Sequence, residues 1–241
     1  MDKIVNNTAD HLTTAVLPRL SIIVPVLNEE VVIAATLASL QPVRELGAEV
    51  ILVDGGSSDA TVCLAHPFVD QSIESPPGRA KQMNAGAAAA RAEVLLFLHA
   101  DTRLPAGALD AILHGLATSN KAWGRFDIVI EGQPLMLHVI ATMMNWRSRL
   151  TGIATGDQAI FVRREDFLAV QGFPQLALME DIAISRQLGQ RSAPLCLQQK
   201  VTTSGRRWSN GGVWRTIAMM WRLRLLYWLG VPPEQLAKAY K

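Results

Sequence analysis

Two aspartates stand where apolar runs of the chain end, and carboxylates in that position can bind nucleotides and metal ions. The run 50–53 ends in Asp54, and the run 94–98 is followed by a turn that contains Asp101. Both runs are typical of buried strands that enter tight turns. In open α/β sheets, ligands bind outside the carboxyl ends of the strands. The two acids therefore predict a nucleotide and metal site in one shared crevice.

Asp54 is open to two interpretations. With Pro25 and Glu29, near the end of an expected strand at 21–26, it would line one wall of a cleft and accept hydrogen bonds from the edge of a base. The run Asp-Gly-Gly-Ser-Ser is equally typical of a turn that needs no ligand. Asp59, further along this turn, fits best as a charge at the N-terminus of the next helix.

Asp101 has the chemistry of a metal ligand. A carboxylate at the tip of a buried strand can hold Mg²⁺ or Mn²⁺ against a diphosphate, and the ion offsets the charge on the departing nucleotide. His99 lies two residues earlier, on the same side of an extended backbone. It is either a second ligand, better suited to Mn²⁺ than to Mg²⁺, or a hydrogen-bonded wall of the site, which is the favoured interpretation.

A basic helix start follows the loop Pro-Pro-Gly. Arg79 and Lys81 offer cations, beside backbone donors, that suit a ribose or a phosphate. The alternative is an ordinary helix start with solvated cations. Asn84 is polar among alanines, which indicates close approach by another group.

The elements that position these residues alternate between strand and helix up to about residue 120, which predicts an α/β fold with a mainly parallel sheet. The expected strands are 21–26, 50–53, 69–73, 94–98, 123–130, 159–162 and 196–202, and the expected helices are 31–40, 60–65, 79–91, 105–118, 135–150, 181–188, 211–229 and a short one from 232. Because the chain contains no low-complexity linker, we expect both halves to share one continuous sheet.

The composition is that of a globular protein, with 49% hydrophobic and 18% charged residues. A net charge of +2 argues against binding to nucleic acid. Cys63 and Cys196 are expected to be buried thiols rather than a disulfide, which favours a reducing, cytoplasmic location. No uncharged stretch reaches the length of about 18 residues that a spanning helix needs. Residues 1–19 are expected to form a flexible tail and not a signal peptide.

Four segments occur in a recognisable order: SIIVPVLNEE, VDGGSSDAT, GRAKQMNAG and the acidic turn after FLH. This order resembles that of family 2 glycosyltransferases with the GT-A fold. The run PPGRAKQMNAGAAAA…FLHADT also resembles a bacterial subgroup described as radical-SAM or selenodomain-associated transferases. The resemblance implies a single GT-A-like domain over 20–208, with a Rossmann-like, mainly parallel mixed sheet flanked by helices. Residues 209–241 would be a C-terminal helical extension.

The resemblance implies a nucleotide-diphosphate sugar, linked to UDP or GDP, as the donor. The positions that would contact this donor are Pro25, Glu29, Asp54, Asp59, Arg79, Lys81, Asn84, Ala100 and Asp101. Asp101 takes the place of the last acid in the family's Asp-X-Asp metal motif, whereas His99 stands where the first acid would be. The implied cofactor is Mn²⁺ or Mg²⁺, and its candidate ligands are Asp101 and His99.

Glu180 and Asp181 resemble the Glu-Asp pair of the family. There the aspartate is the catalytic base that takes the proton from an acceptor hydroxyl, and one such carboxylate suffices for single displacement with inversion. Without the upstream motifs, the pair would be read only as acids that favour a helix N-terminus. With them, both residues are predicted to be catalytic.

Two further segments are candidates for the acceptor and diphosphate sites. Arg206, Arg207 and Trp208 resemble the family's Gln-X-X-Arg-Trp region, with Ser204 in place of the glutamine, which argues against a polymerising enzyme. The arginine would clamp diphosphate and the tryptophan would stack on a sugar. Asp157 would hydrogen-bond sugar hydroxyls. The alternative for Arg206, Arg207 and Trp208 is a basic surface loop, and the alternative for Asp157 is a Gly-Asp turn.

The expected helix 211–229 is rich in both aromatic residues and arginine. Such a helix can lie at a membrane surface, which would place the protein at the inner face of the membrane. It can equally cover the sheet or form a homodimer contact, with its arginines extended outward.

The sequence thus predicts a metal-assisted, inverting glycosyltransferase that acts on an acceptor hydroxyl. Rivals are disfavoured because the first strand is followed by LNEE and not by the glycine-rich loop of dinucleotide-dependent oxidoreductases or sugar nucleotidyltransferases. The remaining alternative is a non-catalytic protein that binds a nucleotide-sugar with the same fold.

Overall fold

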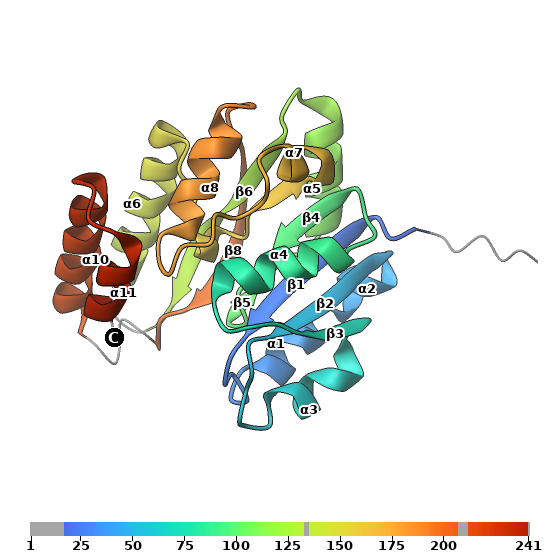
Figure 1. The fold of residues 1–241 in the computed structure, drawn as a ribbon. Coiled ribbons are helices and arrows are strands. Elements are labelled where there is room, and N and C mark those ends of the chain that lie inside the picture. The colour runs from blue at the N-terminus through green and yellow to red at the C-terminus, as the bar shows by residue number, and fades with distance from the viewer. Residues whose placement is uncertain (1–16, 133–134, 207–211, 241) are drawn as a thin grey trace, which may run out of the picture.

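The computed structural model describes residues 17–132, 135–206 and 212–240, and it shows one sheet with helices on both faces (Figure 1). Eight strands follow the order β3-β2-β1-β4-β7-β6-β8-β5. Parallel pairs of these strands outnumber antiparallel pairs by four to three. The prediction of a continuous, mixed and mainly parallel sheet is confirmed.

The first half of the sheet is made of continuous apolar runs. β1 (Leu20–Val26) pairs in parallel with both β2 (Ala48–Asp54) and β4 (Val94–Phe97), and β2 pairs in parallel with β3 (Gln71–Glu74). All residues of β1, β2 and β4 are buried, as is typical of parallel strands covered on both faces. Their carboxyl ends therefore meet at one edge of the sheet.

In the second half of the sheet, β6 and β8 run in the same direction as β1 and β4, although the strand between β4 and β6 is antiparallel. β7 (Phe161–Arg163) runs antiparallel to both β4 and β6 (Trp123–Glu131), and β6 runs parallel to β8 (Leu195–Ser204). The carboxyl ends of β6 and β8 thus lie at the same edge as those of β1 and β4. The short β5 (Thr102–Arg103), antiparallel to β8, brings the turn after β4 to this edge as well.

Two apolar cores cover the two faces of the sheet. Alternation along β1 sends Ile22 to the first core and Ile23 to the second. The helices on the first core are α1 (Ile33–Ser39), α2 (Gln41–Glu45), α3 (Thr61–Ala65), α5 (Ala108–Thr118) and α6 (Met136–Thr151). Those on the second core are α4 (Arg79–Ala89), α7 (Arg164–Ala169) and α8 (Glu180–Gly189).

The C-terminal helices form a small apolar cluster of their own. In Figure 1, α10 (Val213–Trp228) and α11 (Pro233–Tyr240) lie together beside α6. Leu223 of α10 and Leu236 of α11 pack against Met179 and Ile182 at the start of α8. The helical extension therefore closes one end of the space between α6 and α8. None of the described helices is both long and apolar enough to cross a membrane.

Most of the expected elements are confirmed within a few residues. The sequence patterns missed β5 and α7, which span too few residues to show a period. The expected burial of Cys63 is wrong, because α3 buries Thr61 and Ala65 and turns Cys63 outward; Cys196 is half-buried, and both thiols are free. The domain boundaries stay predictions, since residues 1–16 and 207–211 lie outside the described part.

Candidate active site

A cavity of about 1150 Å³ opens at the carboxyl edge of the sheet, between the strand ends and α6, α8 and α10. Pro25 is the second-last residue of β1, Asp101 follows β4, and Asp181 lies at the start of α8. The cavity exceeds the range of about 300–1,000 Å³ that is common for ligand pockets. It is therefore large enough for two reactants side by side.

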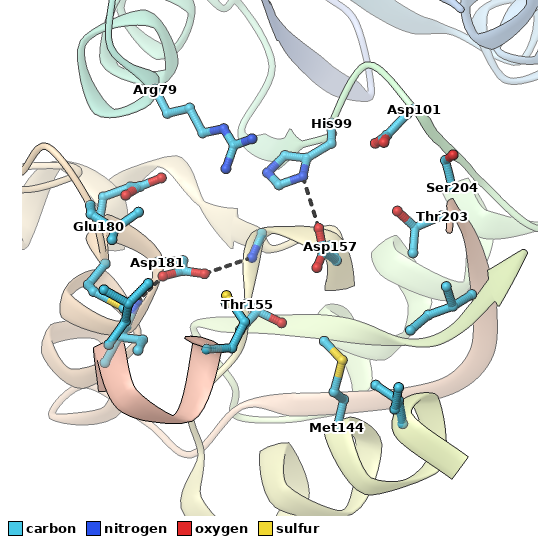
Figure 2. Close-up of a pocket in the computed structure, with 18 of the residues that line it drawn as sticks. Arg79, His99, Asp101, Met144, Thr155, Asp157, Glu180, Asp181, Thr203 and Ser204 are labelled. Carbon is cyan, nitrogen blue, oxygen red and sulfur yellow. Dashed lines mark hydrogen bonds and ion pairs between the residues drawn. The ribbon is translucent and has the colours of Figure 1, made fainter. Parts of the chain in front are cut away.

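His99, Asp157 and Asp181 are joined through the short 3-10 turn η2 (Gly156–Gln158) (Figure 2). The Nδ1 of His99 lies 3.2 Å from Oδ1 of Asp157. The backbone N–H of Gly156 donates to Oδ2 of Asp181 at 3.1 Å, and Ile182 donates to Oδ1 at 2.7 Å. These contacts fix the orientation of the Asp181 carboxylate. The pairing of His99 with Asp157 agrees with His99 as a wall of the site, and this role stays a prediction.

Glu180 is buried beside Asp181, with 7% of its surface exposed. Burial, followed by the neighbouring charge of Asp181, raises the pKa of the Glu180 carboxyl. Met179 precedes the helix with a left-handed backbone, at φ 69°, and this turn directs both acids toward the cavity. The two carboxyls thus share one helix start but differ in their exposure to solvent.

Asp101 faces the cavity next to Arg206 and Glu29. Arg206 Nη2 lies 3.2 Å from Glu29 Oε2 and 3.6 Å from Asp101 Oδ2. The backbone N–H of Ser204 donates to the carbonyl of Asp101 at 3.2 Å, which holds the turn after β4 against the end of β8. Arg206 therefore spans the two acids and brings a positive charge to this side of the cavity.

The candidate metal ligands are few in the described residues. Asp101 offers a carboxylate, while the imidazole of His99 is engaged with Asp157. Across the described ranges, no group of three or more His, Cys, Asp or Glu side chains could hold an ion. Mg²⁺ is commonly bound by one or two carboxylates together with substrate phosphates. Asp101 at the wall of an open cavity fits an ion of that kind, shared with a donor diphosphate.

The cavity brings together only part of the predicted site. Lining it are Pro25, Glu29, Arg79, His99, Ala100, Asp101, Asp157, Glu180, Asp181 and Arg206. Asp54, Asp59, Lys81 and Asn84 are not among the lining residues. Arg207 and Trp208 lie outside the described residues.

Asp54 and Asp59 are occupied by contacts within the loops. β1 separates β2 from β4, so the strand that ends in Asp54 is not adjacent to the strand that precedes Asp101. Asp54 is 5% exposed, and its carboxylate accepts hydrogen bonds from the backbone of Gly56 and Ser57 and from the Ser57 hydroxyl. Asp59 accepts hydrogen bonds from the backbone N–H groups of Thr61 and Glu30. Both acids hold the loop beside the cavity in shape.

Asn84 and Lys81 lie along α4, away from the cavity. The Asn84 side chain donates to the carbonyl of Phe173 at 2.8 Å and accepts from its N–H at 2.9 Å. The predicted close approach at Asn84 is thus a contact with the protein's own backbone. Lys81 is exposed.

Three lining residues were missed at the level of sequence. Gln82 is buried and donates to the carbonyls of Val26 at 2.8 Å and Val53 at 2.9 Å, so it ties together the ends of β1 and β2. Arg147 of α6 and Arg224 of α10 also line the cavity. The sequence does hold one signal for the two arginines. Met143 precedes Arg147, and Met220 precedes Arg224, by four residues, so each arginine shares a helix face with an apolar residue.

The two missed arginines carry buried N–H groups without acceptors. Nε and Nη2 of Arg147 and Nε of Arg224 have no hydrogen-bond partner among the described residues. Burial, followed by the charge of Arg224, lowers the pKa of Arg147 to about 10. Burial also lowers the pKa of Arg224. Two arginines with buried, unpaired N–H groups on one cavity indicate a site for an anion.

The sequence relationships agree with the geometry. A sequence model of glycosyl transferase family 2 matches residues 21–168. The chain belongs to glycosyl transferase family 2. The probable glycosyltransferase YdaM of Bacillus subtilis (strain 168) is 27% identical in an alignment 195 residues long that covers 70% of this chain and 46% of that protein. This family 2 chain thus spans about half the length of that relative.

Solved structures show the same GT-A fold at low sequence identity. Staphylococcus aureus TarS 1–349 in complex with UDP-GlcNAc has a TM-score of 0.63 at 19% identity, over 77% of this chain and 58% of that one. Glucosyl-3-phosphoglycerate synthase from Mycobacterium tuberculosis, with Mn²⁺, UDP and phosphoglyceric acid, has a TM-score of 0.61 at 17% identity, over 89% and 80%. Mannosyltransferase PcManGT from Pyrobaculum calidifontis, with GDP-Man and Mn²⁺, has a TM-score of 0.57 at 20% identity, over 78% and 57%.

Proposed function

We propose that this family 2 chain transfers a sugar from a nucleotide-diphosphate donor to an acceptor hydroxyl with inversion. The observation that carries the proposal is that Asp101 and Asp181 line the same cavity, which also holds the cations Arg79 and Arg206. A charged leaving group at Asp101 and a proton acceptor at Asp181 are the two functions that inverting transfer needs. Family membership and the nucleotide-bound relatives support this proposal.

The donor diphosphate is assigned to the side of the cavity near Asp101. Arg206 supplies positive charge there, whereas Arg79 at the start of α4 lies nearer to Glu180, with His99 between it and Asp101 (Figure 2). The N-terminus of α4 adds backbone donors to the cavity. Pro25 and Glu29 line the same cavity and would border the base of a UDP- or GDP-linked sugar. Asp54 and Asp59 would act through the shape of their loop rather than through direct contact.

A divalent ion, Mn²⁺ or Mg²⁺, would neutralise charge on the diphosphate when bound, with Asp101 as its protein ligand. His99 would orient Asp157, which faces the same space. Arg206 already balances the Asp101 carboxylate at 3.6 Å in the protein alone, so this arginine would approach the phosphates as the donor enters. Glu29 is the nearer ion-pair partner of Arg206, at 3.2 Å, and Asp101 is the carboxylate assigned to the ion, so we expect transfer to depend on the metal.

Asp181 is assigned as the general base. The acceptor oxygen would attack the anomeric carbon, the bond from that carbon to the diphosphate oxygen would break, and the hydroxyl proton would pass to the Asp181 carboxylate. The nucleoside diphosphate then leaves with the bonding electron pair. Hydrogen bonds from Gly156 and Ile182 hold this carboxylate in one orientation, which favours attack from a fixed direction.

Asp181→Asn tests the assignment. We expect this variant to bind UDP or GDP with Mn²⁺ as the wild type does, by calorimetry, and to lose transfer by at least about 10²-fold, which is the lower end of the range for general base catalysis. Asp110→Asn is the matched control, because the Asp110 side chain is 71% exposed and does not line the cavity. Full transfer activity of Asp181→Asn would refute the assignment. Nucleotide binding by the wild type without turnover on any acceptor would instead favour a non-catalytic binding protein.

We further propose that the apolar surface of α6 and α10 touches the inner face of a membrane. Trp146 and Leu150 of α6 are 65% and 75% exposed, and Trp228 of α10 is 73% exposed. Exposed Arg215 adds a positive charge that suits anionic lipid. Trp228→Ser should reduce sedimentation of the protein with phosphatidylglycerol vesicles. Equal sedimentation of the variant and the wild type would contradict the proposed membrane contact. A dimer that this variant dissociates, measured by analytical ultracentrifugation, would assign the surface to a second copy instead.

A further inference from the structure

Arg147 and Arg224 form a paired cationic site that the donor does not explain. They come from α6 and α10, and both line the cavity. The carboxylates whose charges act on both guanidinium groups are Asp181 and Asp157, whereas Arg206 on the donor side pairs with Glu29 and Asp101. Both arginines therefore line the cavity that also holds the proposed base, and the charge of Asp181 acts on both.

Neither arginine of this pair is satisfied by the protein. The buried Nε and Nη2 of Arg147 and the buried Nε of Arg224 find no acceptor in the part of the chain that the structure describes. Buried donors without partners are rare, and each one in a native fold calls for an explanation such as a bound ion. Guanidinium N–H groups match the oxygens of phosphate and carboxylate. A ligand anion between α6 and α10 would satisfy both side chains.

The wall beside this arginine pair is apolar. α6 contributes Met143 and Met144, and α10 contributes Trp214, Ile217, Met220 and Trp221. Methionine and tryptophan side chains adapt to extended apolar ligands and offer large contact areas. Trp214 and Trp221 are 71% and 67% exposed although they line the cavity, so the apolar wall continues to the protein surface. An apolar chain along this wall would reach solvent or a membrane.

We propose that the acceptor is an anionic amphiphile, with its charged group between Arg147 and Arg224 and its apolar part along α6 and α10. The inference rests on the proposed transfer function, since it names the acceptor class for the same cavity. Its charged group acts as an anchor, and the acceptor hydroxyl then faces Asp181. The position of α6 is fixed, because the Asn145 side chain holds it to β6 by hydrogen bonds to the N–H and carbonyl of Ile128 at 2.9 and 3.1 Å.

Binding of simple probes to the wild-type chain tests the acceptor class without any variant. We expect decyl phosphate, below its micelle concentration, to change the tryptophan fluorescence and to bind at least tenfold more tightly than inorganic phosphate. It should also bind at least tenfold more tightly than decyltrimethylammonium, which has the same chain and the opposite charge. Equal affinity for inorganic phosphate would overturn the apolar part of the inference, and equal affinity for the ammonium probe would overturn its anionic part.

Single variants locate the site. Arg147→Met and Arg224→Met should each weaken decyl phosphate binding at least tenfold and leave the binding of UDP and GDP with Mn²⁺ unchanged. Arg222→Met is the matched control, because Arg222 is an exposed arginine of α10 that does not line the cavity. Loss of nucleotide affinity with unchanged decyl phosphate binding would place the pair in the donor site and overturn the inference. If the wild type binds decyl phosphate through these arginines but binds no nucleotide, the proposed function fails and the anionic site stands.

Discussion

Gly156 is the position where a single added carbon should disturb the whole site. A Cβ at this glycine would lie 2.3 Å from Nε2 and 2.6 Å from Cε1 of His99. The backbone of Gly156 is not in the left-handed region, so alanine would meet no backbone penalty there. The perturbation by Gly156→Ala is therefore purely steric and falls on the imidazole.

The size of the effect follows from that overlap. His99 must move by about 1 Å before the new carbon reaches ordinary contact, and overpacking of this kind typically costs about 1–3 kcal/mol. For a domain of about this length each kcal/mol lowers Tm by about 2–4 °C, so Gly156→Ala should melt about 2–12 °C below the wild type. A shift of about 1 Å in a catalytic group can cost about 10²-fold in rate. Because His99 contacts Asp157 and Gly156 donates to Asp181, we expect a loss of that order.

Calorimetry and the rate of nucleoside diphosphate release from the donor measure the two effects. The double variant Gly156→Ala with His99→Ala should recover the Tm lost to the overlap, because the obstructing ring is gone. Gly189→Ala is the control, since a Cβ there meets no described atom within 4 Å. The reasoning is refuted if Gly156→Ala melts with the wild type, or if removal of the His99 ring fails to restore the Tm.

Three further predictions concern stability. Because burial and Asp181 raise the pKa of Glu180, the folded state holds this proton more tightly than the unfolded chain, and stability falls as pH rises above the ordinary glutamate value of 4.5. Glu180→Gln should therefore raise Tm at pH 8 and have little effect at pH 4. Asp54→Ala removes the acceptor of the Gly56 and Ser57 hydrogen bonds and should lower the free energy of unfolding in urea by about 1–3 kcal/mol. Asp127→Ala leaves fully buried Arg125 without its carboxylate and should cost about 3–5 kcal/mol in the same assay.

Each of these three expectations has a clear contrary result. A Tm gain for Glu180→Gln that is equal at both pH values would show that ionisation of Glu180 is not its cause. Wild-type stability of Asp54→Ala together with lost nucleotide affinity would return Asp54 to the base-binding role expected from the sequence. Asp127 also pairs with Arg149 at 2.6 Å, so Arg149→Met should cost less than Asp127→Ala, and the reverse order would contradict the buried charge argument.

The amino-acid sequence by itself determined the parts of this protein that depend on local order. Apolar runs followed by acids predict strand tips, and in a parallel sheet all such tips meet at one edge, where Asp101 lines the cavity; its role there stays a prediction. The Glu-Asp pair before an apolar period likewise predicts a helix start, which the structure confirms at α8. These inferences need only the direction of the strands and the spacing of apolar residues along the chain.

The tertiary structure alone decided which polar groups face the cavity and which serve the fold. Asp54 has the same local pattern as Asp101, but Ser57 and Gly56 surround its carboxylate. Arg147 and Arg224 are ordinary helical arginines in the sequence, yet the fold brings both to one cavity and buries Nε and Nη2 of Arg147 and Nε of Arg224. Burial and pairing arise from contacts between segments far apart in the chain, so they depend on how the helices pack and not on local sequence.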